Sequence, residues 1–170
     1  MQKNLVFLIG FMGVGKTTLG KKIAKKLEYT FVDIDQKIES KFKISINEFF
    51  NKYGETTFRK EETKMLESII SEENNAIISV GGGLPCFNGN MELMNKSGVT
   101  CYLKRPPKEL YHRLVNGKGN RPLLKELNDE ELLLFIENKL NEREMYYNQA
   151  RFVFLRDRQS VENLVEELNL

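Results

Sequence analysis

Short hydrophobic runs alternate with longer amphipathic stretches along the chain. The runs predict five strands, at residues 5–9, 30–34, 76–80, 99–103 and 152–155. The first run is apolar at every position, which is typical of a strand buried on both faces of a sheet. Helical periodicity follows at residues 16–27, where Leu19, Ile23 and Leu27 share one side and lysines occupy the other.

Further helices are predicted between the remaining strands. Their ranges are 46–53 and 57–71, a pair broken at Gly54, then 92–96, 108–115, 129–150 and 160–168, with Ser160 as the N-cap of the last. Strands that alternate with helices favour parallel pairing through right-handed crossovers. We therefore expect a single α/β domain over residues 1–170, with a three-layer α/β/α arrangement and ligands bound at the carboxyl ends of the strands.

Composition and charge narrow the class of protein. The 170 residues include 26 Lys and Arg against 24 Asp and Glu, and the net charge of +2 gives no support for a nucleic-acid or membrane-surface partner. No apolar run reaches the roughly 18 residues of a membrane-spanning helix. The two cysteines are too few for a disulfide framework or a structural zinc site. We expect a cytoplasmic protein that binds neither nucleic acid nor membrane.

Residues 10–17 read Gly-Phe-Met-Gly-Val-Gly-Lys-Thr and fit the phosphate-binding pattern G-x-x-x-x-G-K-[ST] without mismatch. The motif lies between the first predicted strand and helix, where backbone N–H groups and the helix N-terminus can hold an anion. In this pattern Lys16 reaches the β- and γ-phosphates, and Thr17 offers its hydroxyl to Mg²⁺. The residues predicted to bind the triphosphate are Gly13, Val14, Gly15, Lys16, Thr17 and Thr18.

A nucleoside triphosphate can serve a switch, a motor or a small-molecule kinase. A GTPase would carry Asn-Lys-x-Asp after a late strand, but the nearest string, residues 95–98, lacks the aspartate and precedes its strand. A motor would show an apolar strand that ends in Asp-Glu, and the sequence has none. A kinase of a small acceptor remains. It needs an acceptor pocket, a group that handles the hydroxyl proton and a mobile cationic lid.

Asp33 and Asp35 end the second predicted strand. Alternation sends both carboxylates to one face, or to the strand's end, near the expected phosphates. One can hold Mg²⁺ through water, and the other can accept or orient an acceptor hydroxyl. The alternative is that Asp35 only caps the next helix.

Gly81, Gly82 and Gly83 directly follow the third predicted strand. Three glycines at the carboxyl end of a strand allow the backbone to approach a ligand closely. The alternative is a flexible turn without a ligand.

Arg59 and Arg143 each project along the apolar stripe of a predicted helix. An arginine in that position needs an anionic partner. The partner is either an internal carboxylate, such as Glu62 three residues after Arg59, or a ligand carboxylate gripped by the guanidinium fork. Two such arginines favour an anionic acceptor over a neutral sugar.

Residues 116–122 form a glycine-rich, cationic loop after a short predicted helix. Such a loop suits a closing lid, in which Arg121 would stabilise charge on the transferring phosphoryl group. The alternative is a plain surface loop.

Taken in order and spacing, these features resemble the shikimate kinase family, a branch of the nucleoside monophosphate kinase-like P-loop proteins. The segments that carry the resemblance are Gly10–Thr17, Asp33-x-Asp35, Phe58-Arg59-x-x-Glu62, Gly81-Gly82-Gly83, Arg121-Pro122-Leu123-Leu124 and Arg143-x-x-x-Tyr147. The resemblance implies a P-loop kinase fold with sheet order 2-3-1-4-5 and a monomer. It also implies transfer of a phosphoryl group from ATP, with Mg²⁺, to the 3-hydroxyl of shikimate, a step toward chorismate and aromatic amino acids.

The resemblance also implies roles for individual residues, in an acceptor-binding segment at about 33–62 and a lid at about 112–125. For catalysis these are Lys16 at the transferred phosphate, Asp35 as the base that binds the acceptor hydroxyls, and Arg121 in the lid. Thr17 and Asp33 would surround Mg²⁺, and Arg113 would pack on adenine. The acceptor carboxylate would be gripped by Arg59 and Arg143, and Gly81, Gly82 and Gly83 would line the acceptor site.

Two alternatives stay open: a P-loop kinase of another small anion such as gluconate, and a nucleotide-binding regulator without turnover. The combination of Asp35, Arg59 and the three glycines favours shikimate. The sequence departs from the family pattern at two places. Residues 155–158 lack the proline that packs on adenine, and Leu84-Pro85 follows the triple glycine, where smaller residues are frequent.

Overall fold

The computed structural model describes residues 3–115 and 127–169. Its elements in chain order are β1 (Asn4–Ile9), α1 (Lys16–Leu27), β2 (Thr30–Asp33), α2 (Ile34–Phe42), α3 (Ile46–Glu72), β3 (Asn75–Ser79), the 3₁₀ helix η1 (Leu84–Cys86), α4 (Asn90–Ser97), β4 (Val99–Leu103), α5 (Pro107–Val115), α7 (Asp129–Tyr147), β5 (Phe152–Phe154), the 3₁₀ helix η3 (Arg156–Arg158) and α8 (Val161–Glu167). The strands and helices predicted from the hydrophobic pattern are present, with small shifts at their ends.

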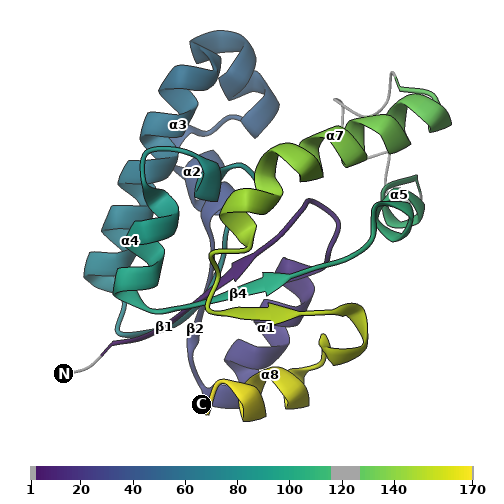
Figure 1. Ribbon diagram of the computed structural model, residues 1–170. Helices are drawn as coiled ribbons and strands as arrows, with labels where there is room; N and C mark the ends of the chain where they lie inside the picture. The colour runs from purple at the N-terminus through teal and green to yellow at the C-terminus, as the bar shows by residue number, and fades with distance from the viewer. Residues whose placement is uncertain (1–2, 116–126, 170) are drawn as a thin grey trace.

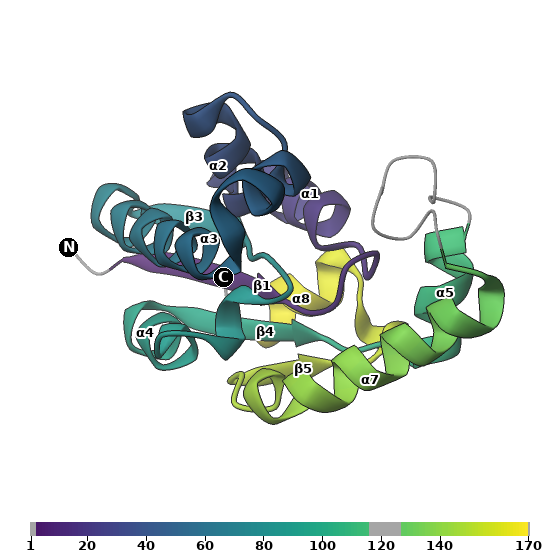
Figure 2. The same ribbon diagram turned by 90° about the horizontal axis from the view of Figure 1, so that it is seen from above.

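Within the described residues, five strands form one parallel sheet in the order β2-β3-β1-β4-β5. This is the order that the family resemblance implies. Helices α1 and α8 cover one face of the sheet, and α3, α4 and α7 cover the other (Figures 1 and 2). The predicted three-layer α/β/α fold is therefore confirmed.

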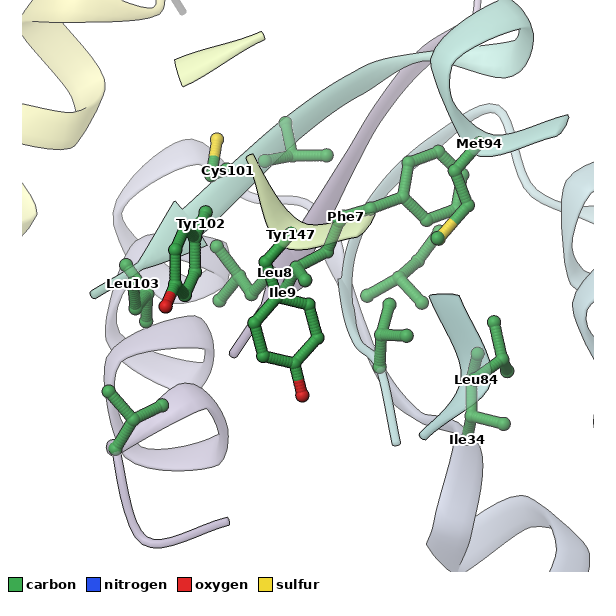
Figure 3. Close-up of a cluster of buried hydrophobic side chains, with 14 of the residues drawn as sticks. Phe7, Leu8, Ile9, Ile34, Leu84, Met94, Cys101, Tyr102, Leu103 and Tyr147 are labelled. Atoms are coloured by element: carbon green, nitrogen blue, oxygen red, sulfur yellow. The ribbon is translucent and has the colours of Figure 1, made fainter. Parts of the chain in front are cut away.

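The core is built on the central strand β1, whose residues 5–9 are at most 1% exposed. Strands β3 and β4 flank it, and the helices of both layers cover it, which explains the continuous apolar run. Figure 3 shows large side chains of this core, among them Phe7, Tyr102 and Tyr147. Among the described residues, no helix is both long enough and apolar enough to span a bilayer.

The end of β2 differs from the prediction. The strand stops at Asp33, and α2 begins at Ile34, because the Asp33 carboxylate caps this helix by accepting a hydrogen bond from the backbone N–H of Gln36 at 3.4 Å. Asp33 and Asp35 therefore do not alternate along one strand: Asp35 lies in the first turn of α2. The alternative that Asp35 is the capping residue is also wrong, since Asp33 has that role.

The predicted break at Gly54 is confirmed. Within α3, Gly54 has φ 77° and ψ 166°, values that an α-helix does not contain, so residues 46–72 are two helices that meet at a kink. The segment starts with a capping box between Ser45 and Glu48. The kink separates a short first part from a second part, and the second part carries Arg59.

Candidate active site

The phosphate-binding loop connects β1 to α1, as predicted. Gly15 precedes α1 with φ 109°, a conformation that glycine adopts without strain, and no side chain caps the helix. The N–H groups of the first helical turn therefore have no side-chain acceptor at this end and can serve an anion. Lys16 Nζ donates hydrogen bonds across the loop to the carbonyl oxygens of Gly10 at 2.7 Å and Phe11 at 3.0 Å.

Thr17 and Asp33, the two residues expected around Mg²⁺, are in direct contact. Thr17 Oγ1 donates a hydrogen bond to Asp33 Oδ2 at 2.8 Å. A hydroxyl and a carboxylate are oxygen donors of the kind that Mg²⁺ prefers, and Mg²⁺ usually takes its other ligands from water and phosphates. In keeping with so sparse a donor set, residues 3–115 and 127–169 contain no cluster of three His, Cys, Asp or Glu side chains able to hold a metal.

A cavity of about 470 Å³ joins the phosphate-binding loop to the carboxyl ends of β2 and β3. Its lining comes from the loop, the strand ends and α5: Met12, Gly13, Gly15, Lys16, Thr17, Thr18, Asp33, Asp35, Ser79, Val80, Gly82 and Arg113. A larger cavity of about 640 Å³ lies among α7, α5 and the ends of β4 and β5, and contains none of the predicted site residues. The smaller cavity therefore holds most of the predicted nucleotide residues and both predicted metal residues together with Asp35 and Gly82, while Arg59, Arg143, Gly81 and Gly83 do not line it.

The carboxyl of Asp35 is placed to exchange a proton near neutral pH. Burial, and then the negative charge of Asp33, raise its pKa to about 6, while Lys16 acts in the opposite direction. A carboxyl with such a pKa is ionised at pH 7 and is still basic enough to accept a proton from a hydroxyl.

Gly81, the first of the three consecutive glycines, lies next to two carboxyl groups. A Cβ atom at Gly81 would be 2.8 Å from Asp35 Oδ1 and 2.9 Å from Glu62 Oε1. Since both oxygens lie so close to one point, the two carboxyls are neighbours. The absence of a side chain at Gly81 is what allows α2 and α3 to bring them together here.

The other two glycines lie next to the two arginines that are predicted to bind the acceptor carboxylate. A Cβ at Gly82 would be 3.2 Å from Arg143 Nη1, and a Cβ at Gly83 would be 2.7 Å from both Nη atoms of Arg59. The triple glycine thus permits a close approach of the protein's own charged side chains. It gathers Arg59 and Arg143, which are far apart in the sequence, at one turn.

Arg59 has the internal partner that the sequence analysis left open. Its Nη1 lies 2.5 Å from Glu62 Oε2, and its Nη2 and Nε lie 3.0 Å and 3.2 Å from Glu55 Oε1. A guanidinium has five N–H groups, so one remains on each of Nη1 and Nη2. An ion pair inside the protein and a bond to a ligand carboxylate are therefore compatible at Arg59.

Glu62, which the sequence offers as a partner of Arg59 and as part of the segment Phe58-Arg59-x-x-Glu62, lies beside the predicted site residues. It is 1% exposed, and burial raises its pKa to about 7; Arg59 acts to lower the pKa and Asp35 to raise it. The signal in the sequence is its position four residues before Leu66 on the buried face of α3. A carboxyl on such a face needs a cationic partner.

Arg143 and Tyr147 bring α7 to the triple glycine. Tyr147 is buried, and its hydroxyl donates a hydrogen bond to the carbonyl oxygen of Gly82 at 2.5 Å. The Cζ atom of Arg143 lies 5.6 Å from the centre of the Phe11 ring. In the part of the chain that the structure describes, Arg143 forms no ion pair with a carboxylate, so the internal partner considered for it is not found there.

At the nucleotide end, Arg113 in the last turn of α5 donates a hydrogen bond from Nε to the carbonyl oxygen of Gly13 at 2.6 Å. It thus lies beside the phosphate-binding loop, as a residue that contacts the nucleotide would. Arg121 and residues 116–126 of the predicted lid lie outside the described residues.

The family model and the relatives more than 30% identical to this chain agree on one family. A family model described as shikimate kinase matches residues 12–169. A shikimate kinase from Azobacteroides pseudotrichonymphae is 47% identical over 163 residues, which cover 96% of each chain. Among solved structures, a shikimate kinase from Bacteroides thetaiotaomicron is 42% identical with a TM-score of 0.94 and covers 98% of this chain and 99% of its own. One from Acinetobacter baumannii in complex with shikimate is 31% identical with a TM-score of 0.83 and covers 98% and 91%.

Proposed function

The chain belongs to the shikimate kinase family, and on this premise we propose how its residues carry the reaction of that family. The reaction transfers the γ-phosphoryl group of ATP to the 3-hydroxyl of shikimate and gives shikimate 3-phosphate and ADP. One observation supports the acceptor most directly: the triple glycine gathers Asp35, Arg59 and Arg143 at the end of strand β3, beside the phosphate-binding loop. A carboxylate and two arginines match the hydroxyl and the carboxylate of this acceptor.

At the donor end, the N–H groups of the loop and Lys16 hold the β- and γ-phosphates, together with Gly13, Val14, Gly15 and Thr18. Thr17 and Asp33 hold Mg²⁺, which neutralises charge on the phosphates when it is bound. Arg113 packs on the adenine. The short distance between Thr17 and Asp33 supports this assignment.

At the acceptor end, Asp35 accepts the proton of the hydroxyl that attacks the γ-phosphoryl group. Arg59 and Arg143 hold the carboxylate of the acceptor so that this hydroxyl faces the phosphate. The transfer is a direct displacement in which the protein supplies orientation and charge stabilisation rather than a covalent intermediate. Arg121, on the lid, stabilises the transferred group and helps to exclude water.

For the remaining properties we propose a cytoplasmic monomer, as the family resemblance implies. The acceptor segment and the lid belong to the same single domain. Sedimentation of the purified chain at micromolar concentration tests the first point: a single species of about 20 kDa is expected, and a dimer would contradict it.

The function is tested by ADP release from MgATP, measured with shikimate, with gluconate and without acceptor. Shikimate-dependent release is expected, with the product identified as the 3-phosphate by phosphorus NMR. A Lys16→Ala variant controls for contaminating kinases. Release with gluconate alone would transfer the proposal to another anionic acceptor. ATP binding without acceptor-dependent release would favour a regulatory protein.

A further inference from the structure

The segment that follows the triple glycine packs against Arg59 from two directions. The centre of the Phe87 ring lies 4.5 Å from Arg59 Cζ. The next residue, Asn88, donates hydrogen bonds from Nδ2 to the carbonyl oxygen of Arg59 at 3.3 Å and to Thr63 Oγ1 at 3.0 Å. This segment therefore contacts both the guanidinium group and the backbone of one arginine.

Phe87 differs from the other rings near this guanidinium. Phe50 and Phe58 lie farther away, at 5.7 Å and 5.4 Å from Arg59 Cζ, and both pack on the hydrophobic core. Phe87 is 38% exposed, so burial in the core does not account for it. Its short contact with Arg59 accounts for its position, because a cation over an aromatic face is attracted by the ring. The Arg59 side chain, in turn, is only 13% exposed.

The hydrogen bonds of Arg59 do not fully fix the orientation of its guanidinium group. Glu62 and Glu55 accept from the edges of the guanidinium plane, and the side chain of Glu55 is 59% exposed, which makes that pair weak. Bonds at the edges restrain the position of the group more than the tilt of its plane. The Phe87 ring, whose centre lies 4.5 Å from Cζ, adds a contact that restrains the group further, and the backbone of Gly83, with no Cβ, leaves room for the group beside the turn.

We propose that Phe87 is a positioning residue for acceptor recognition: through its cation–π contact with Arg59, it aims the two remaining N–H groups of the guanidinium at the carboxylate of the acceptor. The inference rests on the proposed function, because it takes Arg59 as a ligand of that carboxylate. It adds a residue that does not touch the reacting atoms and acts only through Arg59. Loss of Phe87 should therefore weaken acceptor binding and leave the nucleotide end unchanged.

The test compares steady-state constants of Phe87→Ala, Phe87→Leu and Phe87→Tyr. We expect Phe87→Ala to raise the KM for shikimate about five- to tenfold, the size of one cation–π contact, with kcat and the KM for ATP within twofold of the wild type. Phe87→Leu, which keeps an apolar cover without a ring, should show most of this effect, and Phe87→Tyr should show almost none. Tyr53→Ala is the matched control, since Tyr53 is 44% exposed on α3 and packs on Phe49.

A double-mutant cycle separates positioning from a general structural effect. In an Arg59→Lys background, Phe87→Ala should change the KM for shikimate less than twofold, because the planar group on which the ring acts is gone. An unchanged KM in Phe87→Ala, or an equal effect in both backgrounds, would overturn the inference. A wild-type protein without shikimate-dependent turnover would instead overturn the proposed function, and with it the inference that rests on it.

Discussion

Two carboxyls, the half-buried Asp35 and the buried Glu62, set the electrostatics of the site at the scale of single residues. Both have raised pKa values because burial penalises their charged forms, to about 6 for Asp35 and about 7 for Glu62. Nearby cations act in the opposite direction, from Lys16 on Asp35 and from Arg59 on Glu62. The site therefore holds negative charge that water would stabilise better, which suits a group that must accept a proton.

Asp35→Asn tests the role of this carboxyl in turnover. The amide keeps the shape of the side chain but cannot accept the proton of the acceptor hydroxyl. We expect kcat to fall by about 10²–10⁴-fold, the usual contribution of a general base, while the dissociation constant for MgATP measured by calorimetry stays the same. Glu67→Gln, at an exposed position of α3, is the control for the loss of one charge. A variant with normal turnover would exclude Asp35 as the base.

The same substitution should also change how stability depends on pH. Because the pKa of Asp35 is about 6 in the folded state and near 3.8 in the unfolded state, the folded state binds more protons between these values. The contribution of Asp35 to the free energy of unfolding therefore falls as pH rises from about 4 to about 6. Asp35→Asn removes this loss. The free energy of unfolding of the variant minus that of the wild type should therefore be larger at pH 8 than at pH 4, by on the order of 2 kcal/mol. Urea unfolding at both pH values measures the difference, and a pH-independent difference would contradict the raised pKa.

At the scale of secondary structure, the turn after β3 is the element on which the site depends. It receives α2 through Asp35, α3 through Arg59 and Glu62, and α7 through Arg143. Each of these side chains approaches the backbone at a position where any other residue would place a Cβ atom. The glycines therefore act as contact points between helices of the same site.

Gly83→Ala tests this contact without backbone strain. Gly83 has φ −90° and ψ −23°, a conformation that alanine adopts freely, so the only change is a Cβ 2.7 Å from both Nη atoms of Arg59. The guanidinium must move away, and we expect the KM for shikimate to rise about tenfold.

Gly89→Ala is the matched control for Gly83→Ala. Gly89 has φ 69°, and a Cβ atom added there would have nothing within 4 Å, so alanine strains the backbone without a steric contact. It should lower stability by about 1 kcal/mol and leave the KM for shikimate unchanged. Equal effects of the two substitutions on KM would show that Gly83 does not act through Arg59.

The elements themselves could largely be predicted from the sequence, because the burial of an element determines its hydrophobic pattern. Residues 5–9 of strand β1 are all apolar since both faces of the strand are covered, and Gly54 and Ser160 mark a break and a helix start. Helix α2 is missing from the sequence prediction, because Ile34 continues the alternation of β2 and only the capping bond of Asp33 ends the strand. The role of Phe87 could not be predicted for a related reason: its partner Arg59 comes from an element distant in the sequence.

At the scale of the whole molecule, the strand order brings donor and acceptor ends together. The phosphate-binding loop follows β1, and the triple glycine follows β3, which is its neighbour in the sheet. Parallel strands end at the same edge, so both turns open on one side of the sheet. The sequence separates these two turns by more than sixty residues, and the fold makes them adjacent.

Stabilisation of the whole chain by each ligand tests whether the nucleotide and acceptor ends of the site bind their ligands separately although they are adjacent. A ligand at 100 times its dissociation constant raises the free energy of unfolding by about 2.7 kcal/mol, which for a chain of this size is a rise in Tm of roughly 5–10 °C. MgADP and shikimate should each produce such a rise in the wild type.

Arg143→Ala removes one of the two groups that hold the acceptor carboxylate, and a loss of about 30-fold in affinity would leave less than about 1 kcal/mol of the shikimate effect at the same concentration. The effect of MgADP should persist, because Arg143 lies at the acceptor end. Lys139→Ala, on the same helix α7, should keep both effects. If Arg143→Ala loses both shifts, or neither, the separation of the two ends argued from the geometry is wrong.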